Sequence, residues 1–252
     1  MRTTTGVEGI DALIEGGVPR GSAILVSGEA GTGKSVLCIQ FILAGIREGE
    51  PGVIATADHP GRVIEAASSL GWDLRGAIDD GFARVVQIDR DEPSPPAASK
   101  ATEGEESAEG AEPPVAAPSA ATLSPAETAA AEIAAAVTEI GAERVVIDPP
   151  LLAGSPDTDA AGEFIASLLH ATLRETHCTT LISGLRVRGA PGLTRLGIEE
   201  QIADGIIDLR VEEDGGRRHR VLAICEMHGT RTNLDDHLFA ILAGRGIVVG
   251  EA

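Results

Sequence analysis

The chain has 252 residues, of which 43% are hydrophobic but only 2% aromatic, and tyrosine is absent. Its formal charge of -19 opposes attraction to nucleic acid or anionic lipid and so excludes a broad DNA-binding face. No apolar run approaches the roughly 20 residues that a membrane-spanning helix needs, and nothing near the N-terminus resembles a cleavable signal. We expect a cytoplasmic protein whose single domain, residues 1–252, has a core of Ala, Val, Ile and Leu.

Short apolar runs alternate with helical patterns in the first part of the chain. The expected elements are a strand at 23–26, a helix at 35–47 that stops at Gly49, a strand at 53–55, a helix at 62–70 and a strand at 84–88. Such alternation predicts parallel β-α-β units, and a core poor in aromatic residues suits a buried parallel sheet covered by helices.

A complete G-x-x-x-x-G-K-S loop lies between the first strand and the first helix. It consists of Gly28, Glu29, Ala30, Gly31, Thr32, Gly33, Lys34 and Ser35. In such a loop the glycines let backbone N–H groups approach phosphate oxygens, and the helix N-terminus adds a favourable dipole. Lys34 is suited to bridge the β- and γ-phosphates and Ser35 to bind Mg²⁺. The loop therefore predicts a nucleotide phosphate site.

A low-complexity insert follows at about 91–123. It consists mostly of Pro, Ala, Glu, Ser and Thr, and the chain's only other lysine, Lys100, lies in it. With almost no large apolar side chain, it buries too little surface to offset the entropy of ordering, so we expect disorder. An acidic chain with two lysines would suit a high-salt cytoplasm, where screening relieves self-repulsion. A melting temperature that does not change between dilute and molar salt would contradict this hypothesis.

Ordered structure is expected to resume at Ser124, where Ser-Pro-Ala-Glu forms a capping box for a helix that ends near Ile140. The elements expected beyond it are a strand at 144–147, helices at 162–175 and near 198–202, and strands at 179–183, 206–211 and 220–225. An acidic, Gly-containing turn separates the last two strands, which predicts an antiparallel hairpin. The predicted fold is α/β, with a mostly parallel twisted sheet, helices on both faces and a C-terminal antiparallel hairpin extension.

Three cysteines, Cys38, Cys178 and Cys225, lie singly in apolar stretches with no C-x-x-C spacing. We expect buried free thiols, with neither a zinc site nor a disulfide framework.

Two carboxylates follow predicted strands. Asp148 ends the apolar run 145–147, where it can hold Mg²⁺ opposite Ser35. An aspartate at a strand end is often only a cap, but the intact phosphate loop upstream favours the magnesium role. Asp58 follows the second strand and is a candidate to orient or deprotonate water. The adjacent His59 has the simpler interpretation of a partly exposed loop residue.

The sequence around these motifs resembles the KaiC-type ATPases of the RecA/RadA superfamily. The resemblance rests on residues 5–13, 16–22, 70–73, 197–210 and 227–230, and it covers nearly the whole chain outside the insert. It implies a RecA-like P-loop NTPase core with ATP as the ligand. It also implies a homo-oligomer, a hexameric ring in the family, in which each nucleotide lies between neighbouring subunits.

The chain departs from that family in three places. Where the family carries paired glutamates, this chain has Ala57 and Asp58, which leaves Asp58 as the sole candidate to position water. The family's lysine, arginine and histidine that reach a neighbour's phosphates correspond here to Glu226, His228 and Thr232. A Pro-Pro pair at 149–150 follows the magnesium aspartate, where the family usually has serine.

These departures predict secure nucleotide binding but slow hydrolysis, since an arginine finger can be worth roughly 10³- to 10⁵-fold in rate. Arg231 is a candidate replacement for the missing charge, and an ordinary exposed turn arginine is the alternative. We therefore expect an ATP- and Mg²⁺-binding regulatory ATPase whose nucleotide state controls assembly or a protein partner.

Two other functions remain open from the sequence. The first is a non-hydrolysing, nucleotide-gated binding module with the insert as a tether. The second is a recombinase accessory ATPase that binds single-stranded DNA through Arg186, Arg188 and Arg195. The acidic chain and the absence of aromatic stacking partners in that loop favour plain solvation of these arginines.

Overall fold

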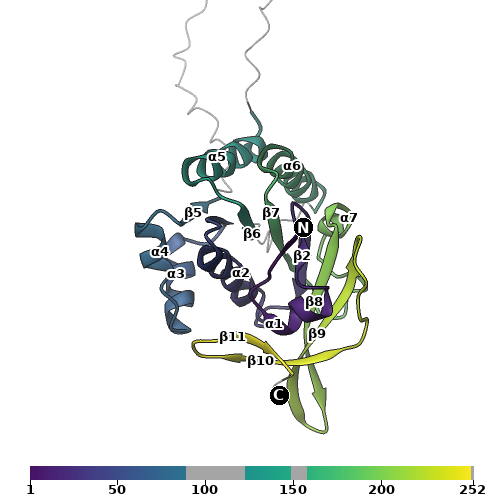
Figure 1. Ribbon diagram of the computed structural model, residues 1–252. Helices are drawn as coiled ribbons and strands as arrows, with labels where there is room; N and C mark the ends of the chain where they lie inside the picture. Colours follow the sequence, from purple (N-terminus) through teal and green to yellow (C-terminus); the bar gives the residue numbers. More distant parts are fainter. Residues whose placement is uncertain (89–122, 149–157, 251–252) are drawn as a thin grey trace, which may run out of the picture.

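The computed structural model describes residues 1–88, 123–148 and 158–250, and its centre is one nine-stranded sheet (Figure 1). The strand order is β11-β10-β9-β8-β3-β7-β6-β4-β5. The six parallel strands are β3 (Ala23–Gly28), β4 (Gly52–Thr56), β5 (Ala83–Gln87), β6 (Arg144–Asp148), β7 (Thr179–Leu185) and β8 (Gly205–Asp214). The antiparallel strands are β9 (Arg217–Met227), β10 (His237–Leu242) and β11 (Gly246–Val249). The predicted α/β fold with its antiparallel C-terminal extension is confirmed.

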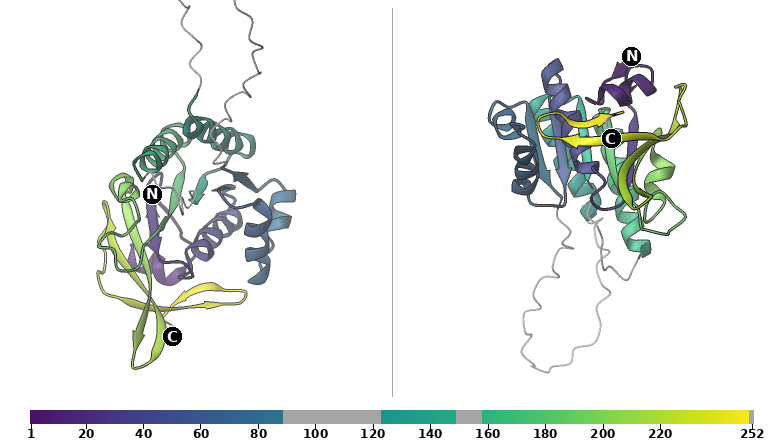
Figure 2. Two further views of the ribbon diagram at one scale, coloured as in Figure 1. Left: turned by 180° about the vertical axis from the view of Figure 1, so that it is seen from behind. Right: turned by 90° about the horizontal axis from the view of Figure 1, so that it is seen from below.

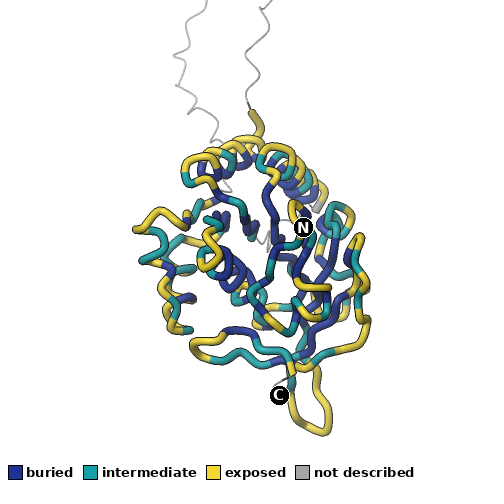
Figure 3. Tube along the Cα trace, viewed as in Figure 1, coloured by how far each residue is buried: buried dark blue, intermediate teal, exposed yellow. Residues whose placement is uncertain are grey.

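Helices cover both faces of the parallel strands (Figures 1 and 2). They are α1 (Glu8–Leu13), α2 (Lys34–Glu48), α3 (Pro60–Ser69), α4 (Leu74–Asp79), α5 (Pro125–Ile140), α6 (Thr158–Thr176) and α7 (Ile198–Ile202). Successive β3 residues serve opposite faces: Ile24 and Val26 pack toward α1 to α4, and Leu25 packs toward α5 and α6. The dark blue strands of Figure 3 show this double burial, which accounts for the continuous apolar runs in the sequence.

The helix after the insert begins as predicted. The Ser124 hydroxyl accepts from the Glu127 N–H at 3.2 Å, and the Glu127 carboxylate accepts from the Ser124 N–H at 2.8 Å. Gly141 ends the helix at φ 62°, a left-handed conformation that favours glycine. The insert itself and the Pro-Pro pair at 149–150 lie outside the described residues, apart from position 123.

Several short elements were not predicted. They are α1, α4, the C-terminal strands β10 and β11, and a small separate sheet of β1 (Arg2–Thr3) and β2 (Val18–Pro19). Across the described ranges, no helix is both long and apolar enough to cross a membrane.

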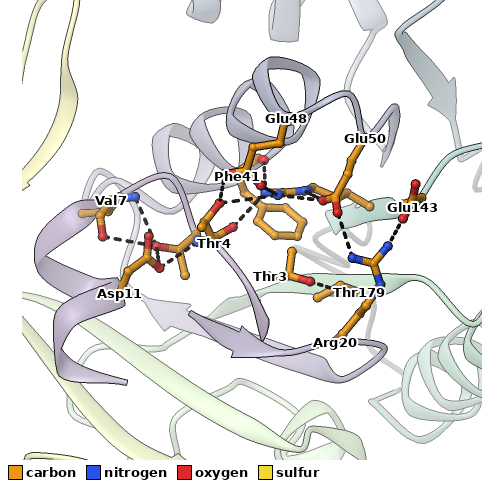
Figure 4. Close-up of polar contacts among 12 residues, drawn as sticks. Thr3, Thr4, Val7, Asp11, Arg20, Phe41, Glu48, Glu50, Glu143 and Thr179 are labelled. Carbon is orange, nitrogen blue, oxygen red and sulfur yellow. Dashed lines mark hydrogen bonds and ion pairs between the residues drawn. The ribbon is translucent and has the colours of Figure 1, made fainter. Parts of the chain in front are cut away.

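A buried arginine, Arg144, joins the N-terminal segment to the sheet. Figure 4 labels several residues of this region, among them Thr4, Phe41, Glu48 and Glu50. The Arg144 side chain is 0% exposed and forms 2.8 Å ion pairs with Glu48 and Glu50. Its guanidinium also donates to the carbonyl oxygens of Thr4 at 2.7 Å and Phe41 at 3.0 Å, and it lies 4.9 Å from the Phe41 ring centroid. Because a buried charge is costly unless it is paired, this cluster fixes the end of α2 against the start of β6.

The hairpin of β10 and β11 folds back over α2 (Figure 2). Gln40 holds it there: its side-chain amide accepts from the Ile247 N–H at 2.9 Å and donates to the Gly6 carbonyl at 2.7 Å. The Trp72 indole donates to the Gly244 carbonyl at 3.3 Å, and its partly buried ring packs against the core. The hairpin thus clamps the helix that follows the phosphate loop.

One prediction about the cysteines is wrong. Cys38 and Cys178 are buried free thiols, but Cys225 is exposed. Cys225 lies on β9, in the antiparallel extension, beside the register irregularity between Ile206 and Ile207. Its apolar neighbours predicted burial, but the irregularity breaks the alternation of facing residues, so Cys225 and the next residue are both exposed.

Candidate functional site

The phosphate loop lies at the carboxyl end of β3, which pairs with β7 on one side and β8 on the other. A Cβ atom at Gly28 would lie 2.6 Å from both the Leu209 carbonyl oxygen and the Thr32 hydroxyl, so only glycine fits there. Gly33 has φ 118° and leads directly into α2. The loop therefore presents its backbone and the N-terminal turn of a 15-residue helix to one side of the sheet edge.

Lys34 is folded onto this loop. Its ammonium group donates to the carbonyl oxygens of Gly28 at 2.6 Å and Glu29 at 3.0 Å. Burial lowers the pKa of Lys34, and the nearby Asp148 carboxylate acts in the opposite direction. Burial therefore destabilises the charged ammonium, and an anion bound beside it would restore part of the lost stabilisation.

Asp148 lies at the end of β6, directly opposite Thr56 of β4 in the strand register. Burial raises the pKa of Asp148, against a hydrogen bond from Ser183 and the charge of Lys34, while Asp58 adds repulsion. The carboxylate is thus incompletely compensated by its own protein surroundings. A cation bound here would relieve both the burial cost and the repulsion.

A pocket between α2, α3, β4 and β6 brings the predicted residues together. Ser35, Thr56, Asp58, Arg62 and Asp148 line its polar side. Its apolar side consists of Cys38, Ile39, Ile54, Val63, Ala66 and Val146. The predicted juxtaposition of Ser35, Asp58 and Asp148 is therefore present in the structure.

Asp58 is held by its local turn. Its N–H donates to the Thr56 hydroxyl at 3.1 Å, and its carboxylate accepts from the Arg62 guanidinium at 3.3 Å. His59 lies outside the pocket lining; its ring Nδ1 accepts from the Gly61 N–H at 3.1 Å and caps α3. The interpretation of His59 as a loop residue agrees with this placement.

Three residues of the site were missed by sequence reasoning. Thr56 lies opposite Asp148 in the strand register and Ser183 forms a hydrogen bond with its side chain, because β4 and β7 are the two neighbours of β6. Arg62 had a detectable signal, since it lies four positions after Asp58, the spacing of an ion pair on a helix.

The arginines after β7 lie largely at the surface, which agrees with the solvation that we favoured from the sequence: Arg188 and Arg195 are exposed, and Arg186 is half-buried. Two of them also pair with acids. Arg186 forms a 2.9 Å ion pair with the buried Asp208. Arg188 forms one of 2.9 Å with Glu29 of the phosphate loop itself. Each of these two cations therefore already has a carboxylate partner within the chain.

The closing segment lies at the surface. His228 contacts Glu226 at 2.9 Å, and both side chains are more than half exposed. The Arg231 side chain is 95% exposed and makes only a long 3.8 Å contact with Glu15. Glu226 and His228, which correspond to neighbour-contact residues of the family, are therefore accessible but are not a lysine and an arginine. Arg231, close to them in the sequence, is an exposed arginine that could supply the charge.

Comparisons with known proteins agree with this architecture. A family model described as "ATPase: KaiC" matches residues 3–252. A UPF0273 protein of Methanopyrus kandleri is 32% identical over 247 residues, which cover 95% of this chain and 88% of that protein. The circadian clock oscillator protein KaiC of Synechococcus elongatus is also 32% identical, over 96% of this chain but 42% of KaiC.

A solved structure shows the same fold. The crystal structure of a KaiC-like protein from Pyrococcus horikoshii superimposes with a TM-score of 0.78 at 27% identity, and the match covers 100% of this chain and 99% of that one. The fold, the phosphate loop and the match along nearly the whole length agree. The chain therefore belongs to the KaiC family of nucleotide-binding ATPases in the RecA superfamily.

Proposed function

We propose that the protein is an ATP- and Mg²⁺-binding regulatory ATPase of slow turnover, whose nucleotide state controls its assembly or a protein partner. The observation that carries the proposal is the convergence of Ser35, Asp58 and Asp148 on one pocket beside Lys34. This set combines a phosphate cradle, a cation and two carboxylates, which are the kinds of group that phosphoryl transfer uses.

The residues present fit magnesium. The described part of the chain holds no cluster of three or more His, Cys, Asp or Glu side chains that would enclose a metal. Mg²⁺ does not need one, because it binds through one or two protein oxygens together with phosphates and waters. The Ser35 hydroxyl and the Asp148 carboxylate would hold it, and the ion would neutralise charge on the β- and γ-phosphates.

The remaining residues of the site bind the phosphates and position the water. Backbone N–H groups of Gly31, Thr32 and Gly33 bind phosphate oxygens, and Lys34 moves from the loop carbonyls to the β- and γ-phosphates. Asp58 orients the attacking water. Its side chain is a methylene shorter than a glutamate and is paired with Arg62, both of which support slow turnover.

The proposal includes a ring in which each nucleotide lies between neighbouring subunits. The exposure of Glu226, His228 and Arg231 supports a contact surface at the closing segment. Within this surface Arg231 is the candidate cation for a neighbour's phosphates. Assembly would then raise the rate per subunit, so activity should increase with protein concentration.

Phosphate release from the wild type, Lys34→Ala and Asp58→Asn tests these roles. We expect Lys34→Ala to lose both ATP binding and turnover, since it removes the cation from the cradle. Asp58→Asn should retain ATP binding by calorimetry and lose about 10²- to 10⁴-fold in turnover. Turnover that neither substitution changes would rule out these assignments.

A non-hydrolysing binding module is the second candidate, and the Asp58–Arg62 ion pair favours it because the pair occupies the water-orienting carboxylate. Tight ATP binding without phosphate release at any salt concentration would establish it. Binding of single-stranded DNA is disfavoured, since Arg186 and Arg188 are paired with Asp208 and Glu29.

A further inference from the structure

The pocket beside the phosphate loop contains an arginine from the same subunit. Of the described residues that line it, Arg62 is the only cationic one. It shares the pocket wall with Ser35 and Asp148, the two residues assigned to Mg²⁺. Arg62 therefore belongs to the same pocket as the residues assigned to Mg²⁺, and neither the phosphate-loop motif nor the strand-end carboxylates account for it.

The backbone that carries Arg62 is fixed at both ends. Ala57 donates its N–H to the Asp148 carbonyl at 3.3 Å, and Asp58 donates to the Thr56 hydroxyl at 3.1 Å. The N–H of Arg62 donates to the His59 carbonyl at 2.8 Å in the first turn of α3. The root of the arginine side chain is thus held relative to β4 and β6, the strands that end in the pocket.

The tip of the same side chain is exposed to solvent. The Arg62 side chain is 73% exposed, and among the described residues its ion pair is with Asp58, itself 59% exposed, at 3.3 Å. Exposed pairs of this kind contribute little to stability and are screened by salt. A terminal phosphate carries more negative charge than one carboxylate, so the guanidinium can exchange its partner at small cost.

We propose that Arg62 is a catalytic arginine that acts in cis, contacting the γ-phosphate of the ATP bound to its own subunit. The inference rests on the proposed ATPase function. Arg62 would supply, from the same subunit, the positive charge that the closing segment lacks at Glu226 and His228. Release of Arg62 from Asp58 also frees the carboxylate to bind water, so one movement prepares both groups.

The step is a direct hydrolysis. The water oxygen forms a bond to the γ-phosphorus while the bond from that phosphorus to the β–γ bridging oxygen breaks. The electron pair of the broken bond leaves on ADP, and the water proton passes to the Asp58 carboxylate. Arg62 stabilises the charge that develops on the equatorial γ-phosphate oxygens, a planar arrangement that matches its two-pronged guanidinium.

A purely structural role makes a different prediction. If Arg62 only stabilises the first turn of α3, its replacement changes stability or affects all nucleotide states alike. If it contacts the transferring phosphoryl group, its replacement weakens the transition state more than the ADP state. ADP with aluminium fluoride, which mimics the transferring phosphoryl group, separates the two.

The test compares Arg62→Gln, Arg62→Lys and the control Arg75→Gln, an exposed arginine on α4 outside the pocket lining. For Arg62→Gln we expect an unchanged melting temperature, an ADP affinity within about twofold, and a kcat about 10²- to 10³-fold lower. Its affinity for ADP with aluminium fluoride should fall by a similar factor. Arg62→Lys should recover part of both losses, and Arg75→Gln should match the wild type.

Mixing distinguishes action in cis from action in trans. Arg62→Gln subunits, which keep an intact loop, are mixed with Lys34→Ala subunits, which keep Arg62. A cis arginine predicts no recovery of ATP turnover in the mixture, and recovery would overturn the assignment. Equal weakening of ADP and of ADP with aluminium fluoride would overturn it as well.

The two proposals fail differently. A wild-type protein that binds no ATP removes the proposed function and this inference together. A wild-type protein that hydrolyses ATP at the rate of Arg62→Gln removes only the inference. If the wild type binds ATP without measurable turnover, the affinities for ADP with aluminium fluoride still test the inference. Equal affinities of the wild type and Arg62→Gln would contradict a contact between Arg62 and the γ-phosphate.

Discussion

Glu50 shows how single residues hold the N-terminal segment in place. It accepts hydrogen bonds from both Arg20 and Arg144, each at 2.8 Å, and its side chain is 17% exposed. Burial alone would raise the pKa of Glu50, but these bonds and the two positive charges outweigh it and lower the pKa. A carboxylate with a depressed pKa in the folded state stabilises that state only while it is ionised.

We therefore predict that Glu50→Gln lowers the free energy of unfolding by about 2 kcal/mol at pH 7, since hydrogen bonds between charged groups are worth about 1.5 to 3 kcal/mol. The folded protein holds the proton less tightly than the unfolded chain, whose reference pKa is 4.5. The wild type's advantage should be complete above that value and disappear as the pH falls below it. Urea denaturation from pH 7 to pH 3 measures the difference, and an equal difference at both ends would contradict the assignment.

At the site, the sequence motifs alone predicted three of the residues that lie together, Lys34, Ser35 and Asp148. Lys34 and Ser35 follow from the loop motif, and Asp148 follows because parallel strands end at one edge of the sheet. Thr56 and Ser183 did not follow, since their position depends on which strands flank β6. Arg62 was overlooked because an i, i+4 pair at the start of a helix is usually only a local stabilising contact.

Among the elements, those with an apolar pattern or a cap in the sequence were predictable. The strands β3 to β9 and the helices α2, α3, α5, α6 and α7 have clear apolar patterns or caps in the sequence. By contrast, the hairpin of β10 and β11 depends on packing against α2, which it contacts through β11, rather than on local propensity. The C-terminal hairpin is held by side chains from distant segments, which no local pattern reveals.

Replacing Gln40 tests whether its side chain holds the hairpin of β10 and β11 against α2. Gln40→Leu keeps the approximate volume but leaves the Ile247 N–H and the Gly6 carbonyl without their partner. Because an unsatisfied buried polar group costs about 1 to 3 kcal/mol, we expect a loss of that order in urea denaturation. The amide hydrogen of Ile247 should also exchange faster with solvent.

Gln201→Leu serves as the matched control, because Gln201 is exposed on α7 and its replacement should change stability by less than about 0.5 kcal/mol. Unchanged exchange at Ile247 in the Gln40 variant would show that the amide does not hold the hairpin.

For the whole molecule, the sheet explains where the site lies. Gly28, Thr56 and Asp148 end three parallel strands at the same edge, and ligands of open α/β sheets bind outside these carboxyl ends. Strands from before and after residues 89–122 belong to one sheet, so we propose that residues 1–252 form a single domain. The strand that precedes these residues, β5, lies at the opposite edge of the sheet from β11.

The central claim is that this fold binds ATP with Mg²⁺ through the phosphate loop. Calorimetric titration of the wild type and Lys34→Ala with ATP, with and without Mg²⁺, tests it most directly. We predict saturable binding by the wild type that Mg²⁺ strengthens, and no binding by Lys34→Ala at the same protein concentration and with an unchanged melting temperature. Equal binding by the two proteins, or none by the wild type, would contradict the account.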